Sequence, residues 1–252
     1  EGDLEPLQVN SGISLLFAPG DRPSTSDLEH LLLVPGHAGQ GARIGHRPPD
    51  DHGWLELLAS GLTFDVSGLA PGAAAPMPHV GQVHDLPADV DSSGCEAISI
   101  MPGAHIAAGG ALMPVLRAMM GLAADLVLQL RTTAVCWNPA CIWMAPGYFS
   151  RLVVHWLAGG PFPALGLTGL RCGADGVVAS SGLAFFIGQE IAVTDRKGAI
   201  GSETMQLAAR IVEHLVGEGP VSRHETLRTA SGEVLALEPS QDGRTVAVSR
   251  GL

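Results

Sequence analysis

The middle of this chain carries very little charge, and this constrains its fold more than any other feature. Residues 94–188 hold three acidic and four basic residues, whereas about a quarter of an average globular domain is charged. A segment so poor in charge must be buried in its own domain or covered by another chain. We therefore expect a packed core here, and homo-oligomerisation is one way to cover it.

Acidic residues gather in the N-terminal third instead. Residues 1–93 hold 13 acids and 3 bases, a net charge of −10 out of −11 for the whole chain. Such a balance provides no basic field for phosphates, so we expect no nucleic-acid partner. An acidic face attracts basic proteins, which are the predicted partner.

Composition also limits the class of protein and its compartment. With 46% hydrophobic residues the chain is not intrinsically disordered. Proline and glycine interrupt every long apolar stretch, so we expect no membrane span. The chain starts without a basic and apolar leader, which predicts a cytoplasmic protein. Its four cysteines are too few for a disulfide scaffold, and we expect free thiols.

Hydrophobic periodicity and turn residues predict an α+β fold, with mixed, largely antiparallel sheets and helices packed on one face. Ser26 and Glu29 have the spacing of a capping box, and Pro114 predicts a late start or a kink in the long helix. The expected helices are 26–33, 107–130, 147–157 and 202–216. The expected strands are 13–17, 62–66, 97–101, 133–137, 165–170, 177–187, 234–237 and 245–248, while 54–59 fits a helix or a strand.

A connection with four prolines, residues 71–93, marks the expected domain boundary. It separates a smaller acidic α+β subdomain, 1–93, from a main α+β domain, 94–252. The sequence Ser-Gly-Leu-x-Phe occurs at 60–64 and again at 181–185. This short repeat is compatible with two related subdomains.

Several short motifs resemble a bacterial family called domain of unknown function 4261. The resemblance spans roughly residues 60–230 and implies a bacterial protein of this architecture, but it implies no activity. The matching residues are Ala75-Pro76-Met77-Pro78, Ala134-Val135-Cys136-Trp137, Pro146, Phe149, Ser180, Gly182-Leu183, Phe186, Glu190, Gly219-Pro220-Val221 and Glu225-Thr226.

Glu190 is the main candidate for a catalytic residue. It follows the apolar segment 182–187, which we expect to be a strand, so its carboxylate would lie at a strand end beside a pocket. The alternative is a structural carboxylate that binds a backbone turn or an arginine such as Arg171. No nucleophile elbow, phosphate-binding loop or zinc-protease motif occurs in the chain.

Aromatic side chains concentrate in one short segment. Trp137, Trp143, Tyr148 and Phe149 surround a predicted turn, although only 4% of the chain is aromatic. Aromatics cluster in cores and at the centres of interfaces. Both interpretations remain open, and these four residues are the predicted binding residues.

Histidines are frequent in the acidic third. His46 and His52 flank Asp50 and Asp51 in one loop, a combination that could bind a divalent metal. The spacing fits no established metal motif, so these two residues are weak candidates and we expect no cofactor.

Three functions remain open on these observations. The favoured one is a non-catalytic protein-binding, adaptor or regulatory module. The alternatives are an enzyme with an unrecognised pocket near Glu190 and Trp137, and a metal-binding protein that uses its N-terminal histidines.

Overall fold

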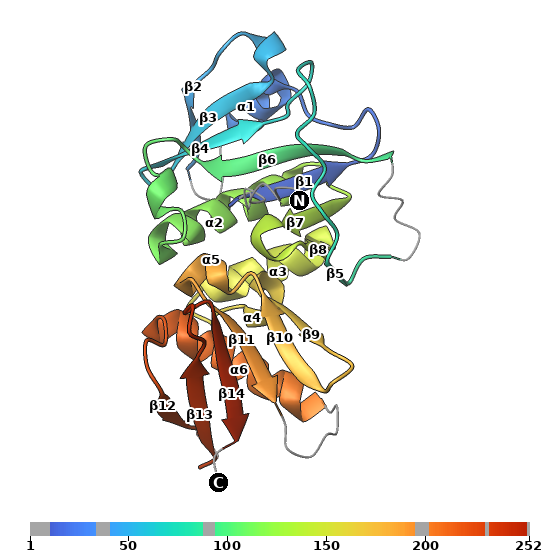
Figure 1. Cartoon of the computed structure of the whole chain (residues 1–252). Helices are drawn as coiled ribbons and strands as arrows, with labels where there is room; N and C mark the ends of the chain where they lie inside the picture. The colour runs from blue at the N-terminus through green and yellow to red at the C-terminus, as the bar shows by residue number, and fades with distance from the viewer. Residues whose placement is uncertain (1–10, 34–40, 88–93, 195–201, 230–231, 251–252) are drawn as a thin grey trace, which may run out of the picture. The chain divides into compact units, whose positions relative to one another are not determined.

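The computed structural model describes residues 11–33, 41–87, 94–194, 202–229 and 232–250, and it divides the chain into two compact units. Unit 1 is Glu1–Gly160 and unit 2 is Pro161–Leu252. Each unit contains one sheet and its own helices, so the α+β prediction is confirmed (Figure 1). Among the described residues, no helix combines the length and the apolar character that a membrane crossing needs.

Unit 1 is built on an eight-stranded sheet with the order β2-β3-β4-β6-β1-β7-β8-β5. Neighbouring strands are antiparallel except for β5 and β8, which are parallel. The strands are β1 (Ile13–Phe17), β2 (Arg43–His46), β3 (Trp54–Ala59), β4 (Leu62–Ser67), β5 (Gln82–His84), β6 (Glu96–Pro102), β7 (Ala134–Trp137) and β8 (Ile142–Met144). The helices are α1 (Thr25–Leu33), α2 (Met113–Gln129) and α3 (Pro146–Leu157), and short 3₁₀ turns cover Asp50–His52, Ala107–Gly109 and Asn138–Ala140.

The boundary between the units differs from the expected one at residue 93. Strand β1 precedes that point, yet it pairs with β6 on one side and β7 on the other. All five residues of β1 are buried, so the strand needs both neighbours. The described part of the proline-rich connection, residues 71–87, therefore lies within unit 1 and contains strand β5.

One face of this sheet is continuously apolar. Cross-strand register places Leu57, Phe64, Ile100, Ile13 and Trp137 on the same side, since side chains alternate along each strand. Helix α2 packs on β3, β4 and β6, and α3 packs on β7 and on α2. As Pro114 predicted, α2 starts late, at Met113, with the proline in its first turn.

The other face carries a smaller apolar cluster beneath the proline-rich loop. Its members are Leu16, Ala97, Ala134, Cys136 and Trp143. The loop is fixed from two sides, because Ala75 N donates to Ala97 O and Trp143 Nε1 donates to the carbonyl of His79. An extended loop thus covers the part of the sheet that the helices leave open.

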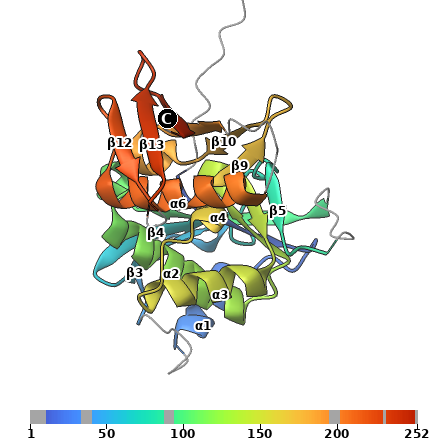
Figure 2. The same cartoon turned by 90° about the horizontal axis from the view of Figure 1, so that it is seen from below.

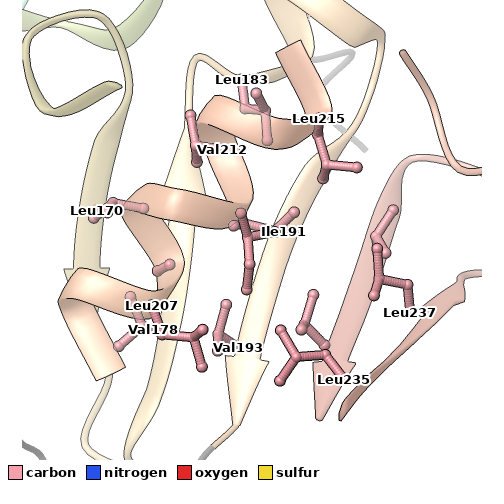
Figure 3. Close-up of a cluster of buried hydrophobic side chains, with 14 of the residues drawn as sticks. Leu170, Val178, Leu183, Ile191, Val193, Leu207, Val212, Leu215, Leu235 and Leu237 are labelled. Carbon is pink, nitrogen blue, oxygen red and sulfur yellow. The ribbon is translucent and has the colours of Figure 1, made fainter. Parts of the chain in front are cut away.

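Unit 2 has a six-stranded sheet with the order β12-β13-β14-β11-β10-β9, in which only β11 and β14 are parallel among the paired strands. Figure 3 shows α6 laid across this sheet, with Val212 and Leu215 facing Ile191. The elements are α4 (Ala164–Leu167), β9 (Gly169–Cys172), β10 (Val177–Ser181), α5 (Ala184–Ile187), β11 (Glu190–Thr194), α6 (Ser202–Glu218), β12 (Glu225–Arg228), β13 (Val234–Pro239) and β14 (Thr245–Arg250). In Figure 2 α6 runs along one side of this sheet.

Two expected strands of unit 2 are wrong in part. Residues 164–167 form a helical turn before β9, and the predicted strand 177–187 ends at Ser181 and is followed by α5. Gly182 has a φ of +84° and interrupts the extended backbone after Ser181, and Gly188, with a φ of +75°, ends α5. The repeated Ser-Gly-Leu-x-Phe also differs in structure, because residues 60–64 form the β3–β4 turn and the start of β4, whereas residues 181–185 end β10 and begin α5.

Helix α1 is capped two residues earlier than predicted. Ser24 and Asp27 bind each other reciprocally: Asp27 N donates to Ser24 Oγ, and Ser24 N donates to Asp27 Oδ2. The Ser24 hydroxyl also donates to Asp27 Oδ2, and this bond, followed by the one from Ser24 N, lowers the pKa of Asp27. The capping box is therefore Ser24 and Asp27, and Ser26 lies inside the helix.

The cap can be tested by paired substitutions. Ser24→Ala removes an N-cap oxygen and should lower the free energy of unfolding by about 1 kcal/mol. Ser26→Ala should change it by no more than about 0.5 kcal/mol. Denaturant unfolding of both variants makes the comparison, and a larger cost for Ser26→Ala contradicts the assignment.

Candidate protein-binding surface

The aromatic residues predicted to form a binding surface lie mostly in the core. Trp137 and Phe149 are fully buried and Trp143 is 2% exposed. Tyr148 is half-buried, with its ring stacked 5.8 Å from that of His84. The structure thus brings three of the four residues into the interior of unit 1, where they cannot contact a partner.

Glu190 is the first residue of β11 and its carboxylate is engaged by a backbone turn. Oε1 accepts hydrogen bonds from the N–H groups of Gly182 and Ala184, at 2.8 and 3.1 Å. Oε2 accepts from Ser180 Oγ and from Leu183 N, while Ser180 Oγ accepts from Ile191 N. The carboxylate therefore satisfies the first N–H groups of α5, which is the structural alternative stated above.

The enzyme alternative loses its basis in this geometry. Glu190 was expected at the end of an apolar strand, but it begins a strand and follows a helical turn. Trp137, its suggested companion, is buried inside unit 1. A carboxylate with both oxygens bound by four donors is poorly placed to exchange a proton with a substrate.

Replacing this carboxylate should cost stability. Glu190→Gln keeps the shape but loses the charge and one acceptor oxygen, so we expect the free energy of unfolding to fall by about 2 kcal/mol. Glu238→Gln is the matched control, because that residue is exposed, its one ion pair within the described part of the chain is with exposed His224, and its replacement should cost about 0.5 kcal/mol or less. Denaturant unfolding measures both variants. An equal fall in the free energy of unfolding in the two would contradict a structural role for Glu190.

The structure does not place the two histidines proposed for metal binding beside enough further ligands to hold a metal ion. His46 and His52 are both exposed, and the His46 ring contacts that of Trp54 at 5.5 Å. Asp50, between them in sequence, accepts from Thr25 Oγ1 and pairs with Arg47. In the part of the chain that the structure describes, no group of three or more His, Cys, Asp or Glu is arranged to hold a metal ion.

The β3–β4 hairpin instead brings two carboxylates together. Ser60 and Gly61 form its two-residue turn with φ of +52° and +78°, a geometry that matches the twist of paired strands. The turn fixes the register, which places Glu56 directly opposite Asp65. Both side chains lie on the face away from the apolar side, because Leu55, Leu57, Phe64 and Val66 alternate with them.

Three further residues shape this part of the sheet. His46 lies opposite Glu56 across a bulge between β2 and β3. Gly45 makes room there, because a Cβ at that position would lie 2.5 Å from Glu56 Oε1. Trp54 is half-buried and its ring contacts that of His46. We call the four residues His46, Trp54, Glu56 and Asp65 the acidic sheet surface.

The two carboxylates repel each other. Burial, and then the charge of Glu56, raise the pKa of Asp65, while His105 opposes the shift. Among the described residues, neither side chain has an ion pair or a hydrogen-bonding partner. Like charges placed directly opposite destabilise a sheet. A cation bound between the two carboxylates would remove this repulsion and stabilise the sheet.

Sequence reasoning missed this pair, although a signal was present. The segment Trp54–Ala59 was compatible with a helix, in which Glu56 would have no fixed neighbour. The turn sequence Ser60-Gly61 between two apolar-alternating segments indicates a hairpin. Once that hairpin is accepted, counting back from the turn pairs residue 56 with residue 65.

Removal of one charge should stabilise unit 1. Asp65→Asn ends the repulsion, and we expect the free energy of unfolding at pH 7 to rise by up to about 1 kcal/mol. A raised folded-state pKa means that the penalty is present above that pKa and disappears as the pH falls toward the ordinary value of 3.8. The advantage of the variant should therefore shrink on acidification, as measured by unfolding at several pH values.

The turn residue Asp242 supplies the contrasting case. Ser240 Oγ and Arg244 N donate to its carboxylate, and these bonds lower its pKa. Asp242→Asn should therefore not stabilise the chain at pH 7. Stabilisation by Asp242→Asn as large as that by Asp65→Asn would show a general charge effect.

A scan against protein-family models and searches of curated proteins and of solved structures found no match to this chain. The resemblance to domain of unknown function 4261 stays a prediction.

Proposed function

We propose that the protein is a non-catalytic protein-binding module that holds a basic partner on the acidic sheet surface. The observation that carries this proposal is the cross-strand pair Glu56–Asp65, two carboxylates that have no ion pair or hydrogen bond among the described residues. A partner's arginine or lysine placed between them would remove the repulsion and add charge-assisted hydrogen bonds.

The charge of unit 1 supports a basic partner. Its 15 acidic and 6 basic residues give −9, whereas the 10 acidic and 8 basic residues of unit 2 give −2. Long-range attraction would raise the association rate with a basic protein, and it would weaken with added salt. The proposal therefore assigns recognition to unit 1.

The Trp54 ring gives the acidic sheet surface a second contact for a cationic side chain. Trp54 is half-buried beside Glu56, separated from it by one residue along β3. A cation held over an indole face gains further attraction, most often when it is a guanidinium. An exposed arginine side chain of the partner fits this combination of a ring and two carboxylates better than a lysine does.

The test compares wild type with the double variant Glu56→Gln/Asp65→Asn. Partners are captured by cross-linking from the native host, identified, purified, and measured by calorimetry at two salt concentrations. We expect a basic partner whose affinity falls at least about tenfold in the double variant, in line with the loss of a charged hydrogen bond.

Glu203→Gln/Glu213→Gln is the matched control, because both glutamates are exposed on α6 and their loss changes net charge equally. This control should bind within about twofold of wild type, since exposed surface charges that do not touch the partner contribute little. Equal weakening in the two double variants would mean that net charge alone, and not the acidic sheet surface, attracts the partner. Failure to capture any partner would refute the proposal.

A further inference from the structure

An open pocket lies in unit 1 where the first turns of α2 meet the end of α3 and the β3–β4 turn. It encloses about 490 Å³, within the range of small-molecule sites. The lining residues are Ser60, Met113, Pro114, Arg117, Ala118 and Leu157. This lining is apolar apart from one hydroxyl and one guanidinium, and it includes no acidic side chain.

Arg117 is held in place by neutral groups. One of its terminal nitrogens donates to the carbonyl of Leu157 at 3.1 Å, and its guanidinium lies 4.9 Å from the centre of the Trp156 ring. Trp156 is itself 4% exposed, so the ring is a fixed platform. The arginine therefore reaches the pocket in a position fixed before any ligand arrives, which lowers the entropic cost of binding.

The charge of Arg117 has no carboxylate counterpart among the described residues. Arg22, Arg47, Arg151 and Arg250 each pair with an acidic side chain. Arg117 is half-buried, yet its contacts are a carbonyl and a ring. A partly desolvated cation of this kind gains from a bound anion, and the planar guanidinium fits a carboxylate with two parallel hydrogen bonds.

We propose that this pocket binds a small carboxylate with an apolar body, the carboxylate on Arg117 and the body against Met113, Pro114 and Leu157. This site is separate from the acidic sheet surface: they share no residue, and the ligand has the opposite charge to the proposed partner. It adds a ligand-binding activity to the proposed protein-binding function and does not depend on it.

The test uses 1-naphthoate and the uncharged 1-naphthamide, which have nearly the same shape. Isothermal titration of the full chain should give an affinity for naphthoate at least about tenfold higher, as a charge-assisted hydrogen bond predicts. Arg117→Gln should bring the two affinities together, while Arg151→Gln, an exposed arginine of α3, should leave the difference intact. Equal affinities in wild type, or no binding of naphthoate, would refute the site.

A second pair of variants covers the case in which Arg117→Gln unfolds the chain. Ser60 is exposed in a turn and lines the pocket, so a substitution there leaves the core unchanged. Ser60→Glu introduces an internal carboxylate that competes for Arg117 and should weaken naphthoate binding at least about tenfold. Ser60→Gln, of the same size without charge, should bind within about twofold of wild type. Equal affinities in these two variants would place naphthoate outside this pocket.

Discussion

Unit 1 depends on the pairing of β1 with two neighbours that come much later in the chain. Its five buried residues exchange backbone hydrogen bonds with β6 and with β7. Without either neighbour, a buried strand that is apolar at four of its five positions would present an unpaired edge, which is a site of aggregation. The low charge of residues 94–160 follows from this pairing, because β6, β7 and β8 are interior strands, α2 packs on β6 and α3 packs on β7. The middle of the chain is thus mostly covered by its own unit.

The half-buried carboxylates of this protein differ in their hydrogen bonding. Glu190 accepts four hydrogen bonds and fixes the turn between β10 and β11. Glu56 and Asp65 lie opposite each other without such donors. The first arrangement contributes to stability and the second reduces it. Sites that reduce stability persist where function requires them, which is why the proposed function rests on the second arrangement.

Much of the fold could be predicted because local signals were strong. The buried strand β1, the late start of α2 at its proline and the closing hairpin near Asp242-Gly243 are all present in the structure. The predictions failed where a tertiary contact decides the conformation. The apolar segment Gly182–Ile187 has the composition of a strand. However, the carboxylate of Glu190 binds the first N–H groups of this segment and favours a helical turn. Likewise, the aromatic cluster was visible in the sequence, but its burial depends on the helices that cover the sheet.

The hydrogen bonds between the side chains of Ser14 and Asn138 have a consequence for how the chain folds. These buried side chains are hydrogen-bonded although 124 residues separate them. Contacts of such separation require that a large loop be closed before they contribute, which slows folding. During synthesis β1 is made before β7, so one edge of this strand stays unpaired until residues 134–137 have been made. Unit 2, whose strands and α6 lie close in sequence, has no comparable delay.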